Sequence, residues 1–427
     1  MTLDRTIAPA IHDAVEFDYK LPPIQSGVLD NGIPCHSLDA GVQEVLETDW
    51  VFPAGVWYEP ANGVAHAVAA LLKSGTATRT AAEINEALEF YGAELRTGAQ
   101  NDQAVVTLYC LSKHLGALLP VVYDMLTSCT FPDYEVELYR TNSIQRLSVN
   151  MRKCEFVANR EIDAALFGKE HPYGRCTQEA SLMALNGADI ASFYKAHYNL
   201  AHAQIFIAGK VGPDALALVN DVFGKKTLIF QPLPPVAFQP TPGEERVVHI
   251  MNDAAGVQGA VRIGRPFPTR HHPDYTPMVV LNTVFGGYFG SRLMSNIRED
   301  KGYTYGIYSG ISPERNGGSM VIQTETGRDV VADAVREVYI EMDRLCNEPV
   351  SEDELLLVKN YLLGGLLGDL DGPFSILRRW RSLILDGFDE TRFNNSVRIY
   401  KSVTPNELQM LARRYFRKEE FYEIVVI

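Results

Sequence analysis

An internal repeat in the order of helices and strands is the feature that most constrains the fold of this chain. Residues 27–209 predict three strands, two helices, a hairpin, a run of helices and a final strand, and residues 246–427 predict nearly the same order. The register agrees as well. Glu137 and Glu354 are 217 residues apart, and Tyr198 and Phe416 are 218 apart. Chance similarity between amphipathic helices is the alternative, but a constant offset favours an internal duplication.

The repeat predicts an α+β protein of two homologous domains, each a mainly antiparallel sheet with helices packed on one face. We expect an N-terminal domain at residues 1–225 and a C-terminal domain at residues 244–427. Residues 226–243 lie between them and are rich in proline, which is typical of a semi-rigid linker. A chain of 427 residues is also longer than one hydrophobic core usually serves.

Composition excludes several classes of partner. The net charge of −14 argues against binding to nucleic acid or to an anionic membrane surface, because both are bound through excess Lys and Arg. The sequence up to Tyr19 has no apolar segment typical of a signal peptide, and no apolar run of membrane-spanning length follows, so we expect a cytoplasmic protein. Six cysteines without a C-x-x-C pair predict reduced thiols rather than a zinc ribbon.

The most distinctive local feature is the stretch 286–308. Three glycines within residues 286–290 predict a turn that side chains with a Cβ tolerate poorly, and helical spacing of apolar residues continues to Arg298. Gly302 is expected to end this short helix, and residues 303–309 predict an aromatic strand. The pattern therefore places Arg298 near the end of a helix, beside the next strand.

Arg298 and Tyr305 of this stretch are candidate substrate-binding residues. A guanidinium offers a fixed fork of donors and a phenol offers one directional donor, so together they suit a peptide carbonyl or a carboxylate. The alternative is structural: Arg298 pairs with Glu299 or Asp300, and Tyr305 packs half-buried on the sheet.

With its glycine turn, arginine and Gly-x-x-Tyr spacing, this stretch resembles the C-terminal half of M16 metallopeptidases (pitrilysin and insulinase-type), in their short M16B form. In the N-terminal half, His171-Pro172-Tyr173-Gly174-Arg175 and Gly75-Thr76 resemble further motifs of the same family. The resemblance covers essentially the whole chain. It implies two similar α+β domains joined by a linker, the M16 peptidase-like fold of the LuxS and metallohydrolase class.

The zinc motif of that family is incomplete here. In active M16 chains the first helix carries His-x-x-Glu-His, in which both histidines bind zinc and the glutamate is the general base. His66 stands at the first ligand position, but Ala69 and Ala70 replace the glutamate and the second histidine. Residues 144–148, around the expected third ligand, contain no carboxylate. We therefore expect no catalytic residue and no bound metal in this chain, with His66 a lone remnant hydrogen-bonded between helix and sheet.

The resemblance also implies a role for Arg298 and Tyr305. Some M16 enzymes pair a chain that keeps the zinc motif with one that has lost it and keeps the arginine and tyrosine. This sequence looks like the second kind. Arg298 and Tyr305 would then bind peptide substrate and complete the active site of a zinc-bearing M16B partner, so the zinc is expected in the partner subunit of a heterodimer.

Two alternatives remain open. One is a homodimeric peptide-binding or scaffold protein without proteolytic activity. The other is an enzyme with a relocated metal or nucleophile. This last alternative is disfavoured because the remaining histidines form no chelating set and because a serine elbow, a P-loop and a G-x-G-x-x-G motif are absent from the sequence.

Overall fold

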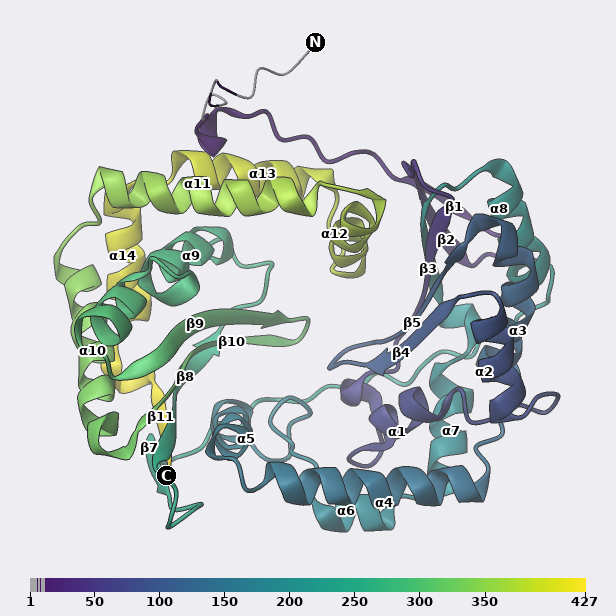
Figure 1. Ribbon diagram of the computed structural model, residues 1–427, viewed down its shortest axis with the longest axis horizontal. Helices are drawn as coiled ribbons and strands as arrows, with labels where there is room; N and C mark the ends of the chain where they lie inside the picture. Colours follow the sequence, from purple (N-terminus) through teal and green to yellow (C-terminus); the bar gives the residue numbers. More distant parts are fainter. Residues whose placement is uncertain (1–5, 7, 9–11) are drawn as a thin grey trace.

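The computed structural model describes residues 6, 8 and 12–427 and contains two β-sheets on opposite sides of the molecule (Figure 1). The expectation that the N-terminus lacks an apolar segment rests partly on residues 1–5, 7 and 9–11, which lie outside the described residues. Helices cover the outer face of each sheet (Figure 1). Among the described residues, no helix combines the length and the apolar character needed to cross a membrane.

The two sheets share one topology. The first has the strand order β1-β2-β6-β3-β5-β4 and the second β7-β11-β8-β10-β9. Each has one parallel pair, β2 with β6 and β7 with β11, and is otherwise antiparallel. The second sheet thus repeats the first without its edge strand β1. The strands are β1 Gln25–Val28, β2 Pro34–Asp39, β3 Val45–Phe52, β4 Glu94–Ala99, β5 Ala104–Leu111, β6 Gln204–Gly209, β7 Val247–Ile250, β8 Gln258–Phe267, β9 Thr304–Glu314, β10 Gly317–Gly327 and β11 Tyr422–Val426.

The helices repeat in the same way. Helix α4 begins at Asp133 and α11 at Glu352, while α7 begins at Gly187 and α14 at Pro405, so the offsets are 219 and 218 residues. The helices are α1 Val64–Leu71, α2 Ala81–Phe90, α3 Leu115–Ser128, α4 Asp133–Asn150, α5 Cys154–Phe167, α6 Glu179–Ala184, α7 Gly187–His197, α8 Pro213–Val219, α9 Tyr275–Asn282, α10 Val331–Asn347, α11 Glu352–Asp369, α12 Pro373–Leu385, α13 Glu390–Ser402 and α14 Pro405–Tyr415.

Helix starts follow the local sequence. Thr80 and Glu83 form a capping box at the start of α2, in which the threonine side chain and the glutamate side chain each satisfy a backbone N–H of the other residue. Thr404 and Glu407 do the same at the start of α14. The two halves therefore begin key helices with the same device.

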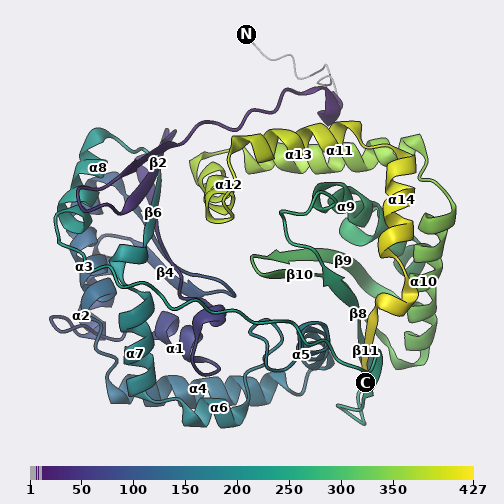
Figure 2. The same ribbon diagram turned by 180° about the vertical axis from the view of Figure 1, so that it is seen from behind.

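Each half contributes one helix to the other half's sheet. Helix α5 of the first half packs on β8 and β11 of the second sheet, where Val157 and Ile162 meet Ala260 and Ile424. The helix at the equivalent repeat position, α12, crosses to the first sheet (Figures 1 and 2). The face of each sheet that its own half leaves bare is thus covered by a helix from the other half, an arrangement that the sequence pattern did not predict.

Apolar packing and ion pairs both fix α12 on the first sheet. Leu377 and Trp380 of α12 lie in one buried cluster with Phe206 of β6. Two carboxylates on β3 are buried beneath the helix, Glu47 at 1% and Asp49 at 0% exposure, and each pairs with an arginine of α12. Guanidinium groups of the other half partly offset the cost of burying these carboxylates.

Two extended segments also tie the halves together. The linker between them crosses from the first half to α5 and the second sheet (Figure 2). It is anchored on the way: Trp57 Nε1 donates to the carbonyl of Val236 at 3.4 Å. At the other end of the chain, the backbone N–H of Val15 donates to Asn360 of α11, so the N-terminal segment runs from the second half's helices to the first sheet.

Candidate functional site

The glycines of the 286–308 stretch are required by close packing. Gly286 lies in a π-helical turn, Thr283–Gly287, and a Cβ there would lie 2.7 Å from the Cβ of Ser309 and 2.8 Å from Leu293 Cδ1. The φ angles of Gly286, Gly287 and Gly290 are not positive, so the absence of a Cβ matters for space and not for backbone conformation. Gly302 is different: its φ of 69° ends the helix as predicted.

The predicted short helix is a π-helical segment, Met294–Asp300. Leu293 and Ile297 are fully buried in the second core, which fixes the segment against the sheet. Arg298 lies in its last turn with about a third of its side chain exposed. The wider turn of a π-helix is a local departure from regular geometry that is frequent at functional sites.

A β-bulge turns Tyr305 toward solvent. Strand β9 pairs with β10 as Thr304 with Thr326 and Ile307 with Thr324, so Tyr305 and Gly306 together face the single residue Glu325. An extra residue bends a strand and re-aims its side chain. In a regular strand Tyr305 would share the buried face with Ile307, two residues on. With the bulge, Tyr305 is 98% exposed.

Two threonine hydroxyls hold the bulge in place. Thr304 Oγ1 donates to the carbonyl of Glu325 at 2.7 Å and accepts from the N–H of Gly306 at 3.0 Å. Thr324 Oγ1 on the neighbouring strand lies 2.9 Å from Thr304 Oγ1. These bonds replace the ladder bonds that the bulge breaks, so the exposed position of Tyr305 is held by the fold.

Arg298 is attached to the same bulge. Its Nε donates to the backbone carbonyl of Tyr305 at 3.0 Å, and its guanidinium lies over the ring of Phe289 at 4.7 Å from the centroid. The structural alternative is half present: one guanidinium nitrogen is 3.8 Å from the carboxylate of Glu299. Half-buried packing of Tyr305, however, is wrong. The side chains of Arg298 and Tyr305 both reach the surface, and the hydrogen bond from Arg298 to the carbonyl of Tyr305 keeps them close together.

An open cavity of about 730 Å³ adjoins these two residues. Its walls come from the end of the π-helical segment and from β9 and β10. It is lined among others by Gln258, Arg298, Tyr303, Tyr305 and Glu325. β9 is the edge strand of its sheet, so backbone groups stand beside the donors of Arg298 and Tyr305. The donors of Arg298 and Tyr305 and the edge of β9 can hydrogen-bond an extended peptide.

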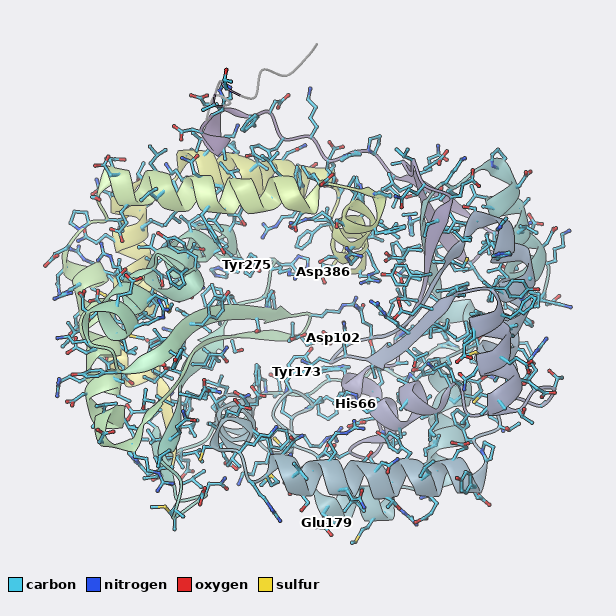
Figure 3. The ribbon with its side chains drawn as sticks, viewed as in Figure 1. His66, Asp102, Tyr173, Glu179, Tyr275 and Asp386 are labelled. Carbon is cyan, nitrogen blue, oxygen red and sulfur yellow. The ribbon has the colours of Figure 1, made fainter. Side chains whose placement is uncertain are left out.

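The other sequence candidates lie on α1 of the first half. His66 is exposed and makes no hydrogen bond to another described residue, so the expected bond between helix and sheet is not found. Ala69 is buried at 2% and Ala70, one turn from His66, is exposed. Figure 3 places His66 on the side of the first half that faces the second. One imidazole beside methyl groups does not fit zinc, and no group of three potential ligands occurs among the described residues.

Sequence reasoning missed Glu59, which organises the start of α1. One of its carboxylate oxygens accepts from the N–H groups of Gly63 and Ala65 at 3.2 and 3.0 Å, and the other accepts from Arg175 at 3.0 Å. Burial raises the pKa of Glu59, while these donors lower it. The available signal was a carboxylate four residues before a glycine that opens a helix.

The His171–Arg175 motif is structural in this fold. Its arginine pairs with the capping Glu59, and its Tyr173 hydroxyl donates to Asp102 in the turn between β4 and β5. The same hydroxyl accepts from the backbone N–H of Asn316, at the tip of the β9–β10 hairpin, at 3.3 Å. The motif thus connects helix α1 with the point at which the hairpins of the two halves meet (Figure 3).

Comparisons with known proteins agree over both halves. A family model described as insulinase (peptidase family M16) matches residues 48–176, and one described as peptidase M16 inactive domain matches residues 184–362. An uncharacterized zinc protease of Mycobacterium bovis is 27% identical over 360 residues, which are 82% of this chain and 81% of that protein. Mitochondrial-processing peptidase subunit beta of Bos taurus is 25% identical over 404 residues, 85% and 76% of the two chains.

A solved structure shows the same fold. The peptidase M16 inactive domain from Pseudomonas fluorescens superposes with a TM-score of 0.84 at 21% identity, covering 94% of this chain and 98% of that one.

Proposed function

The chain belongs to peptidase family M16, and from this premise we propose that it is a non-catalytic subunit that binds peptide and completes the active site of a zinc-bearing partner chain. One contrast carries the proposal. The positions of the family's glutamate and second histidine hold Ala69 and Ala70, whereas Arg298 and Tyr305 are presented at an open cavity. The chain has therefore lost the groups that activate water and kept those that hold a substrate backbone.

In this role Arg298 and Tyr305 orient the peptide. The Nε of Arg298 is already bound to the carbonyl of Tyr305, so its side chain is held in place where it lines the cavity, and its terminal N–H groups make no hydrogen bond to another described residue. These groups and the phenol donate to carbonyls of a bound peptide. Fixing a scissile bond in place lowers the entropic barrier to its cleavage without any proton transfer by this chain.

Two kinds of support come from relatives. The bovine relative is named as a subunit of a processing peptidase, which is in keeping with assembly from more than one chain. The mycobacterial relative is named as an uncharacterized zinc protease, which is in keeping with a role in metal-dependent proteolysis. The first experiment is a native pull-down with identification of the recovered chains. We expect a stoichiometric partner of similar length that carries His-x-x-Glu-His.

The second experiment tests the residues in that complex. Arg298→Ala is expected to lower the rate of peptide cleavage by about tenfold or more, because a charge-assisted hydrogen bond to substrate is lost. Arg336→Ala is the matched control, since Arg336 is an exposed arginine on α10 that pairs only within its own helix. Assembly is followed by native mass. Unchanged cleavage by an intact Arg298→Ala complex contradicts the role given to Arg298.

Recovery of this chain only with itself favours the alternative, a homodimeric peptide-binding protein without proteolytic activity. In that case Arg298→Ala is expected to weaken peptide binding, and no fraction of the purified protein should cleave peptide.

A further inference from the structure

A second cavity, of about 410 Å³, lies within the helices of the second half. It is enclosed by α9, α11, α12 and α13 and shares no lining residue with the cavity beside Arg298. Figure 3 shows Tyr275 and Asp386 on two sides of this region. The volume is that of a typical pocket for a small ligand.

The charges around this cavity do not balance. Three arginines and two aspartates line it. Arg270 pairs with Asp386 at 2.7 Å, and Arg379 pairs with Asp369. The third arginine, Arg392, has no carboxylate partner among the described residues, which leaves one positive charge in excess.

Arg392 is held in place by neutral groups. Its guanidinium donates to the carbonyl of Arg270 at 2.6 Å and lies over the rings of Tyr275 and Phe388, 5.9 and 5.1 Å from their centroids. Its side chain is only partly exposed. Burial lowers the pKa of Arg392, and the like charge of Arg270 acts in the same direction. An anion in the cavity would relieve both effects.

The rest of the lining suits an apolar ligand body with one polar end. Val279, Leu362, Leu366 and Phe393 supply apolar surface. Tyr400 adds a hydroxyl that makes no hydrogen bond to another described residue. A guanidinium fork with a nearby phenol matches the geometry of a carboxylate.

We propose that this cavity binds a ligand with one carboxylate and an apolar body, with Arg392 as the partner of the carboxylate. The inference does not depend on the proposed function, because it concerns a different cavity. The carboxylate can belong to a small free acid or to the C-terminal residue of a peptide, since both present the same group.

Calorimetric titration of the full chain with N-acetyl-leucine and with its uncharged amide tests the proposal. We expect saturable binding of the acid and at least tenfold weaker binding of the amide, because the amide offers Arg392 no charge. Arg392→Gln is expected to lower affinity for the acid by about tenfold or more. Arg398→Gln is the control on the same helix: Arg398 is exposed, so affinity should stay unchanged.

A second pair of variants tests the cavity volume without changing a charged residue. Gly365 lines the cavity, and a Cβ at Gly365 or Gly364 would meet no atom within 4 Å. Gly365→Leu should abolish binding while leaving the fold intact, whereas Gly364→Leu, outside the lining, should not. This pair keeps the test decisive even if Arg392→Gln folds poorly.

The proposal is overturned if the wild-type chain binds neither ligand, if acid and amide bind equally, or if Gly365→Leu binds as tightly as wild type. An acetylated tetrapeptide ending in leucine distinguishes the two sources. Tighter binding than N-acetyl-leucine assigns the cavity to peptide termini, and weaker binding assigns it to small free acids.

Discussion

Glu47 is a carboxylate with 1% of its surface exposed, lying under a helix that belongs to the other half of the chain. Burial raises its pKa to about 7, and the charge of Asp49 adds to the rise, while Tyr109, Arg378 and Arg381 partly offset it. The ordinary value is 4.5. The folded state therefore holds a proton that the unfolded chain releases more readily.

The sign of the pH dependence follows from this shift. Between pH 4.5 and about 7 the folded state binds more protons at Glu47 than the unfolded state does, so stability falls as pH rises and levels off above pH 7. Chemical denaturation should show wild type losing up to about 3 kcal/mol relative to Glu47→Gln over this window. Parallel pH profiles for the two proteins would contradict the assignment.

Single residues of the site were partly predictable. Arg298 and Tyr305 follow from a glycine turn, a helix end and a strand, which are local patterns. The exposure of Tyr305 was not predictable, because a bulge depends on the pairing register between β9 and β10. That register is not encoded in either strand alone. Glu59 was missed for a related reason: its donors include Arg175, which lies far along the chain.

Among the elements, a run of helices was predicted in each half, but the sheets that α5 and α12 cover were not. An amphipathic pattern shows that a helix has an apolar face, and it does not say which sheet that face covers. Helix α13 was not predicted at all, since Phe393 and Val397 are its only buried side chains. By contrast, the common order of helices and strands along the two halves was predicted, because an internal repeat is detected from sequence offsets alone.

The ion pairs of α12 give a prediction at this scale. Arg381→Ala leaves Asp49 buried at 0% exposure without its arginine, and we expect it to cost about 3–5 kcal/mol of unfolding free energy. Arg379→Ala, two positions earlier, removes a pair that is partly exposed on both sides and should cost less than about 1 kcal/mol. Urea denaturation of both variants gives the comparison.

A double variant separates charge from packing. Adding Asp49→Asn to Arg381→Ala removes the unpaired charge and should recover much of the lost stability. If the double variant is as unstable as Arg381→Ala alone, the loss comes from the packing of the arginine stem.

For the whole molecule, the exchange of helices makes the halves dependent on each other. Residues 1–243 expressed alone would leave the first sheet without α12, exposing Leu38, Val51 and Phe206. We expect this fragment to bind a hydrophobic dye and to aggregate, and co-expression with residues 244–427 to yield a soluble complex of the two. A monomeric fragment with cooperative unfolding of its own would show that α12 is dispensable.

The same exchange limits how the chain can move. A hinge lets two bodies swing apart when they are joined at one place, but here α5 attaches at one end of the contact and α12 at the other (Figure 1). Swinging the halves open would pull at least one helix off a buried apolar cluster. We therefore expect the two halves to move as one rigid body. If the chain has the proposed role, access of a peptide to Arg298 and Tyr305 would depend on movement between subunits and not within this one.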